Sequence, residues 1–166
     1  MLALQRFFVP AALFVLAAGC GSGGGRAAGD GTFADGPETV QLEVTHRSEW
    51  RQLWIEGATD LPDGAYVNYR IAHEAAETVP VEEWPAENLM DTGRAAVQDN
   101  QFWTRINTFR WPRGEVRVIV QFPLPPQPEE VVARYGEFGE RLGGDNVTER
   151  AGMRAVEVEH VFEHRP

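Results

Sequence analysis

The residue types that this chain lacks narrow its chemistry more than the types it contains. Its 166 residues include one cysteine, Cys20, and all 15 basic residues are arginines, because lysine is absent. The two serines, Ser22 and Ser48, stand outside any G-x-S-x-G turn. One cysteine cannot form an intrachain disulfide or a multi-thiolate zinc site, and without lysine there is no Schiff base. Most routes to covalent catalysis are closed, and no cofactor is expected.

Two histidines near the end of the sequence have the spacing of a zinc motif. His160 to His164 spells H-x-x-E-H, which on a helix places both histidines on one face. Here the two residues belong to an alternating strand pattern, and the rise of a strand separates them by about 13 Å. That distance is too long for a shared metal ion. The sequence therefore predicts the end of a strand and no metal site.

Asp91 offers the one enzymatic alternative. Asp91-Thr92-Gly93 resembles the catalytic loop of aspartic proteases, whose small all-β members work as homodimers in which two aspartates share a proton. The resemblance implies an aspartic-type peptidase that uses Asp91. However, Arg94 replaces the small residue usual in that family, and D-T-G is also an ordinary turn sequence. We therefore predict a protein that is not an enzyme.

Residues 1–19 have the three parts of a secretory signal. Arg6 provides positive charge, a twelve-residue apolar run follows, and small residues precede Cys20. The run is shorter than the roughly 20 apolar residues of a permanent membrane helix. Leu16-Ala17-Ala18-Gly19-Cys20 resembles the lipobox of bacterial lipoproteins, which implies lipidation of Cys20. Residues 20–36 then form a glycine-rich tether, so we expect a lipid-anchored protein on the extracytoplasmic face of a membrane in the cell envelope.

The charge of the remaining chain limits its partners. After residue 19 there are 14 arginines and 25 acids, a net charge of −11. Such acidity disfavours nucleic acid and anionic lipid headgroups, which attract basic surfaces. It is compatible with a basic protein, a cation or a glycan. We expect a monomer whose contact with the membrane is the lipid on Cys20.

The segment 74–91 is predicted to be a long acidic loop that provides the contact surface. It contains six acids and no arginine, and it shows no clear hydrophobic period. Trp84, which precedes a proline, is the tryptophan expected to be most exposed. Together with Glu82, Glu83 and Glu87 it forms the candidate binding site. The alternative is a solvated loop whose charges only keep the protein soluble.

From residue 37 onward the hydrophobic residues alternate with a period of two, which is typical of half-buried strands. Seven strands are expected, at 40–45, 50–57, 66–73, 94–98, 101–109, 115–122 and 154–163. One short helix is expected at 128–135, with Pro128 at its first position and Gly136 at its end. This pattern resembles immunoglobulin-like and fibronectin-III-like secreted domains. The predicted fold class is an all-β, antiparallel immunoglobulin-like sandwich over residues 37–166.

Two further groups of residues leave alternatives open. The five tryptophans could build an aromatic platform for sugars, although core packing and turn anchoring are the favoured interpretation. Asp60 and Asp63, or the acids of 74–91, could bind Ca²⁺, although solvated acidic loops are commoner. The function predicted is a non-catalytic binding module, with a carbohydrate-binding or purely structural envelope module as the alternative.

Overall fold

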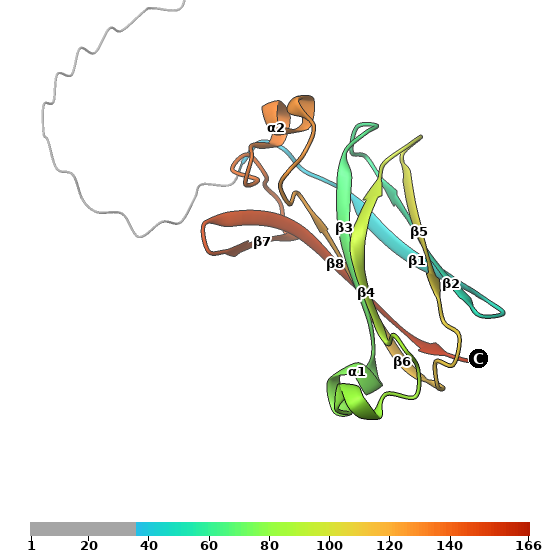
Figure 1. Ribbon diagram of the computed structural model, residues 1–166. Helices are drawn as coiled ribbons and strands as arrows, with labels where there is room; N and C mark the ends of the chain where they lie inside the picture. Colours follow the sequence, from blue (N-terminus) through green and yellow to red (C-terminus); the bar gives the residue numbers. More distant parts are fainter. Residues whose placement is uncertain (1–35) are drawn as a thin grey trace, which may run out of the picture. The chain divides into compact units, whose positions relative to one another are not determined.

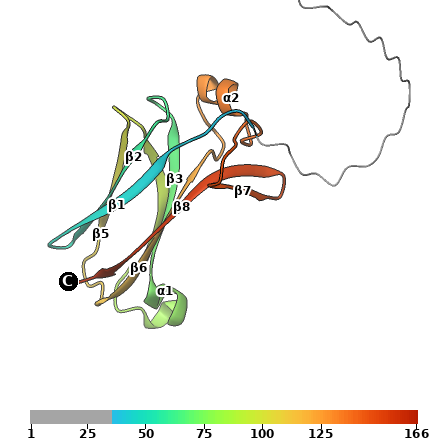
Figure 2. The ribbon, with the colours of Figure 1, turned by 180° about the vertical axis from the view of Figure 1, so that it is seen from behind.

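The computed structural model describes residues 36–166, which form a sandwich of two antiparallel β-sheets (Figures 1 and 2). The signal segment, Cys20 and nearly all of the tether lie outside the described residues. The smaller sheet has the strand order β1-β2-β5, and the larger sheet has the order β4-β3-β6-β8-β7. The strands are β1 Leu42–Glu49, β2 Gln52–Thr59, β3 Tyr66–His73, β4 Met90–Ala96, β5 Gln101–Asn107, β6 Gly114–Phe122, β7 Val147–Arg150 and β8 Met153–His164.

The chain crosses between the two sheets three times, after β2, after β4 and after β5. These crossings interleave the sheets, as in the Greek-key connections of an immunoglobulin-like sandwich. The predicted all-β antiparallel fold is confirmed. The predicted strand at 66–73 has the observed bounds Tyr66–His73.

The core lies between the sheets and follows the predicted alternation. On β6 the side chains of Val116, Val118, Val120 and Phe122 are fully buried. Leu53 of β2 faces them from the smaller sheet and is also fully buried. Because alternate strand residues face opposite sides, the intervening residues of β2 are left on the outer face of the smaller sheet.

An eighth strand was not predicted. The sequence indicated a glycine-rich loop as far as Arg150, but Val147–Arg150 pairs antiparallel with the beginning of β8. The hairpin turns at Ala151 and Gly152, which both have positive φ. The last three residues of β7 are exposed, so the strand has no alternating hydrophobic pattern to reveal it.

The prediction of one long loop at 74–91 is wrong. Helix α1, Glu74–Thr78, begins where the Nδ1 atom of His73 accepts a hydrogen bond from the backbone N–H of Ala75 at 3.0 Å. A 3₁₀ helix, η1, covers Val81–Glu83, and β4 already begins at Met90. Side-chain capping and short helical turns therefore replace the irregular connection. The predicted helix is confirmed as α2, Glu129–Tyr135.

The two ends of the sandwich carry different segments. Helix α2 lies at one end, near the beginning of the described chain, and the backbone N–H of Gly36 donates to the carbonyl oxygen of Leu142. The turn between β1 and β2, the connection from β5 to β6, and helix α1 lie at the opposite end (Figures 1 and 2). No helix within residues 36–166 combines the length and the apolar character needed to cross a membrane.

Candidate functional site

Trp84, the centre of the predicted contact surface, is half-buried and not exposed. Its side chain packs against the hydrophobic core, and its indole Nε1 donates to the carbonyl oxygen of Val79 at 3.0 Å. Glu82, Glu83 and Glu87 are exposed as expected. The prediction of an exposed aromatic side chain among these acids is therefore wrong, because the indole ring packs against the hydrophobic core.

Asp91 is the second residue of β4, an edge strand of the larger sheet. Asp91, Thr92 and Gly93 belong to β4 and pair with β3, where Tyr69 lies opposite Gly93. The hydroxyl of Tyr69 donates to Asp91 Oδ2 at 3.5 Å. The resemblance to aspartic proteases implied a loop at this point, and the structure has a strand.

The predicted strand end at His160 and His164 is confirmed, since both residues lie on β8. His160 Nε2 lies 2.8 Å from His46 Nδ1 of β1. Burial lowers the pKa of His46, and the neighbouring His160 lowers it further. His164 is buried and packs edge-on against the indole of Trp111. The two histidines of the motif therefore have separate partners.

The two aspartates considered as calcium ligands accept hydrogen bonds from backbone N–H groups of other segments. Asp60 Oδ1 accepts a hydrogen bond from the backbone N–H of Gln41 at 2.8 Å. Asp63 Oδ1 accepts one from the backbone N–H of Asp99 at 2.9 Å. Within residues 36–166, no three His, Cys, Asp or Glu side chains gather closely enough to hold a metal ion.

Exposed aromatic side chains lie instead on the outer face of the smaller sheet. Trp103 of β5 is 62% exposed. Its ring lies beside that of Trp54 on β2, with 5.4 Å between the ring centroids and an angle of 45°. The period-two pattern could have placed both residues there, because Trp54 follows buried Leu53 and Trp103 follows buried Phe102.

Two arginines flank Trp54 across the sheet. Arg47 of β1 and Arg105 of β5 are its direct cross-strand neighbours. Their guanidinium carbons lie 4.9 Å and 5.6 Å from the centroid of the Trp54 ring, within range of a cation–π interaction. The indole is therefore held between two cationic side chains on neighbouring strands.

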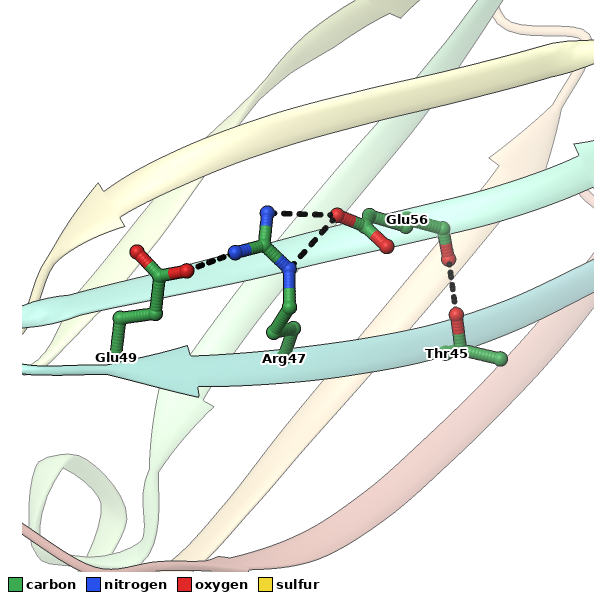
Figure 3. A network of polar contacts seen from close by, with 4 residues as sticks. All are labelled: Thr45, Arg47, Glu49 and Glu56. Atoms are coloured by element: carbon green, nitrogen blue, oxygen red, sulfur yellow. Dashed lines mark hydrogen bonds and ion pairs between the residues drawn. The ribbon is translucent and has the colours of Figure 1, made fainter.

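A polar network fixes the carboxylate of Glu56 on the same face (Figure 3). Arg47 Nη2 donates to Glu56 Oε1 at 3.2 Å, and another nitrogen of Arg47 binds Glu49. Thr45 Oγ1 donates to the backbone carbonyl oxygen of Glu56 at 3.3 Å. Exposed ion pairs of this kind contribute only about 0–1 kcal/mol to stability. Their main consequence here is to orient Arg47 and the two carboxylates.

Four of these residues, Thr45, Trp54, Glu56 and Trp103, line a groove of about 430 Å³ on the outer face, which we call the Trp54–Trp103 groove. It is lined by Glu43, Thr45, Trp54, Glu56, Gly57, Ala58, Gln101, Phe102 and Trp103. Aromatic walls with a few fixed polar groups are the usual composition of a ligand site. Comparison with protein-family models, curated proteins and solved structures gave no match.

Proposed function

We propose that this chain is a lipid-anchored cell-envelope protein whose β-sandwich is a non-catalytic binding module. The Trp54–Trp103 groove is its binding face. The observation that carries the proposal is the exposed Trp103, set beside Trp54 on the sheet and bordered by the carboxylate of Glu56, which Arg47 holds in place. Tryptophan is strongly enriched among residues that dominate binding energy, and sheet-borne side chains are held more firmly than loop side chains.

The groove suits a glycan. The ring of Trp103 provides an apolar surface for the C–H face of a sugar, and aromatic rings combine a large contact area with little loss of conformational freedom. Glu43 and Glu56 supply carboxylate acceptors for hydroxyl groups, and Gln101 supplies both a donor and acceptors. Hydroxyl-rich ligands need this mixture of donors and acceptors around an aromatic platform.

The binding face is tested by recovery of partners from intact cell envelopes. Trp103→Ala is expected to abolish recovery of a partner that the wild-type domain captures, while the melting temperature stays unchanged because the side chain is exposed. Phe138→Ala is the matched control, since Phe138 is also an exposed aromatic residue but lies in a different part of the domain, after α2. Equal recovery by wild type and Trp103→Ala would place the binding face elsewhere.

The anchor has a separate test, based on the sequence pattern that ends at Cys20. Cys20→Ala removes the thiol that would be acylated, so the variant should not incorporate labelled fatty acid and should remain an unprocessed precursor. Fatty-acid labelling of the variant equal to that of the wild type would contradict the lipoprotein assignment without affecting the binding face.

A further inference from the structure

A second hollow of about 430 Å³ lies on the same sheet, toward the turn between β1 and β2. It is lined by Arg51, Gln52, Arg105, Ile106, Asn107 and Phe109. No carboxylate is among these described lining residues, although the chain has 25 acids and only 15 arginines. The hollow is thus a local concentration of cations and amides on an acidic protein.

The guanidinium group of Arg51 is held by two aromatic rings. Its central carbon lies 3.9 Å from the ring centroid of Trp50 and 4.6 Å from that of Phe109. The side chain of Trp50 is 78% exposed, so this stacked pair lies at the surface. Stacking uses the flat face of a guanidinium and leaves its in-plane N–H donors free for an anion. No acid within residues 36–166 forms an ion pair with Arg51.

The other polar groups of the hollow are also arranged as donors. Arg105 lies over Trp54, and no ion pair joins it to an acid in the described part of the chain. Asn107 Oδ1 accepts a hydrogen bond from the backbone N–H of Phe109 at 2.9 Å. That bond fixes the orientation of the amide and leaves its NH₂ group available to donate. Two guanidinium groups and an amide NH₂ are a suitable donor set for an oxyanion.

Of the four acids around the hollow, two are paired with Arg47 and two line an adjoining hollow. Glu49 and Glu56 are bound by Arg47. Glu87 and Asp91 line an adjoining hollow of about 290 Å³, which shares Arg105, Ile106, Asn107 and Phe109 with this one and also contains Arg110. At physiological ionic strength, charges more than about 8 Å away are largely screened. Within the two adjoining hollows the three arginines Arg51, Arg105 and Arg110 face only two carboxylates, so positive charge prevails locally although the whole protein is acidic.

We infer that Arg51 and Arg105 bind an oxyanion, a carboxylate or a phosphate, carried by the ligand of the Trp54–Trp103 groove. Trp103 and Arg105 are two residues apart on β5, so their positions on this face are about 7 Å apart. A ligand that covers the groove can reach the hollow with its next unit. This inference rests on the proposed function, because it names the chemistry of the ligand at that face: an anionic glycan.

Isothermal titration calorimetry at 0.1 M salt tests the inference with three probes. Hexagalacturonate presents carboxylates, and its fully methyl-esterified form has the same backbone without charge. Tripolyphosphate presents phosphate alone and serves as a competitor. The variants are Arg51→Gln and Arg105→Gln, with Arg150→Gln on exposed β7 as the charge-matched control. Trp103→Ala reports on the aromatic groove, and the melting temperature of each variant reports on folding.

The wild-type domain is expected to bind hexagalacturonate at least tenfold more tightly than the ester. Arg51→Gln and Arg105→Gln should each weaken hexagalacturonate binding roughly tenfold to a hundredfold, as for loss of a charge-assisted hydrogen bond. Both should leave binding of the ester unchanged, whereas Trp103→Ala should weaken both oligomers. Competition by tripolyphosphate would show that phosphate is accepted as well, and its failure would assign the site to carboxylates.

Two results would overturn the inference. The first is equal affinity of the wild type for the acid and the ester, with arginine variants that behave like Arg150→Gln. The second is the absence of saturable binding by either oligomer or by tripolyphosphate. Neither result decides whether the Trp54–Trp103 groove is a binding face. That proposal has its own test, the recovery of partners from cell envelopes, and it fails if Trp103→Ala recovers the partner as well as the wild type does.

Discussion

Two buried histidines should make this domain less stable as the pH falls below about 6.5. His73 and His164 are 1% and 2% exposed, and both pack edge-on against the indole of Trp111. Burial lowers the pKa of His73, although its bond to the Pro112 carbonyl and the nearby Glu74 act in the opposite direction. Burial also lowers the pKa of His164, and His73 lowers it further.

The direction of the effect follows from proton binding. Both pKa values lie below the ordinary value of 6.5, so the unfolded chain binds more protons than the folded chain as the pH falls through 6.5. The stabilisation is therefore complete above that pH and is lost below it. A histidine that stays neutral in the folded state contributes a slope of at most about 1.4 kcal/mol per pH unit. The pair contributes up to roughly 2.7 kcal/mol per pH unit.

His164→Phe separates the two contributions. The phenyl ring can keep the edge-on contact with Trp111, and it removes two ring nitrogens that are buried without a hydrogen-bond partner in the described chain. At pH 7.5 the free energy of unfolding should therefore stay within about 1 kcal/mol of the wild-type value or rise. The pH dependence of the free energy of unfolding, measured by urea denaturation between pH 7.5 and 5, should therefore be weaker than in the wild type.

His73→Phe should behave differently, because His73 caps α1 and binds the carbonyl oxygen of Pro112. Its loss should destabilise the domain at every pH, by about 1 kcal/mol for the cap alone. If His164→Phe keeps the full wild-type slope between pH 6.5 and 5, the argument from the buried pair is wrong.

Two further predictions concern the core. Val118→Asp places an unpaired charge at a fully buried position of β6 and should cost several kcal/mol, enough to unfold the domain, whereas Val161→Asp on the exposed side of β8 should change stability by less than about 0.5 kcal/mol. An unchanged melting temperature for Val118→Asp would show that β6 is not central. Gly57→Ala would place a Cβ 2.0 Å from the Phe102 ring and 2.5 Å from the carbonyl oxygen of Glu43, so the midpoint of urea denaturation should fall by the equivalent of about 1–3 kcal/mol. The reasoning about this close contact is refuted if the midpoint does not move.

The elements that sequence reasoning predicted well are those with local signals. The alternation over Tyr66–His73 and the Pro128 and Gly136 boundaries of α2 depend on neighbouring residues alone. Strand β7 carries no such signal, since most of its side chains are in water. Helix α1 depends on the cap supplied by His73, a residue that belongs to the preceding strand.

The candidate site shows where local reasoning ends. Trp84 stands among acids and prolines, which suggested exposure, but its ring is covered through contacts with the core and Val79. Trp103 could have been placed on the outer face by alternation alone. The sequence alone could not have shown that Arg51 and Phe109 are in contact, because they lie in two turns that come together only when β2 pairs with β5.

The whole-protein charge and the charge of the hollow at Arg51 and Arg105 act over different distances. In dilute salt, at about 0.01 M, the Debye length is about 30 Å, so the excess of acids across the domain repels an anionic ligand. Near 0.15 M it is about 8 Å, which removes most of that repulsion but leaves the two short arginine contacts. Affinity for an oxyanion should therefore rise before it falls as salt is added. A basic partner attracted by the acids of α1 and η1 would instead lose affinity at every step. The shape of the salt dependence thus distinguishes recognition by the arginine hollow from steering by the acidic surface that the sequence first suggested.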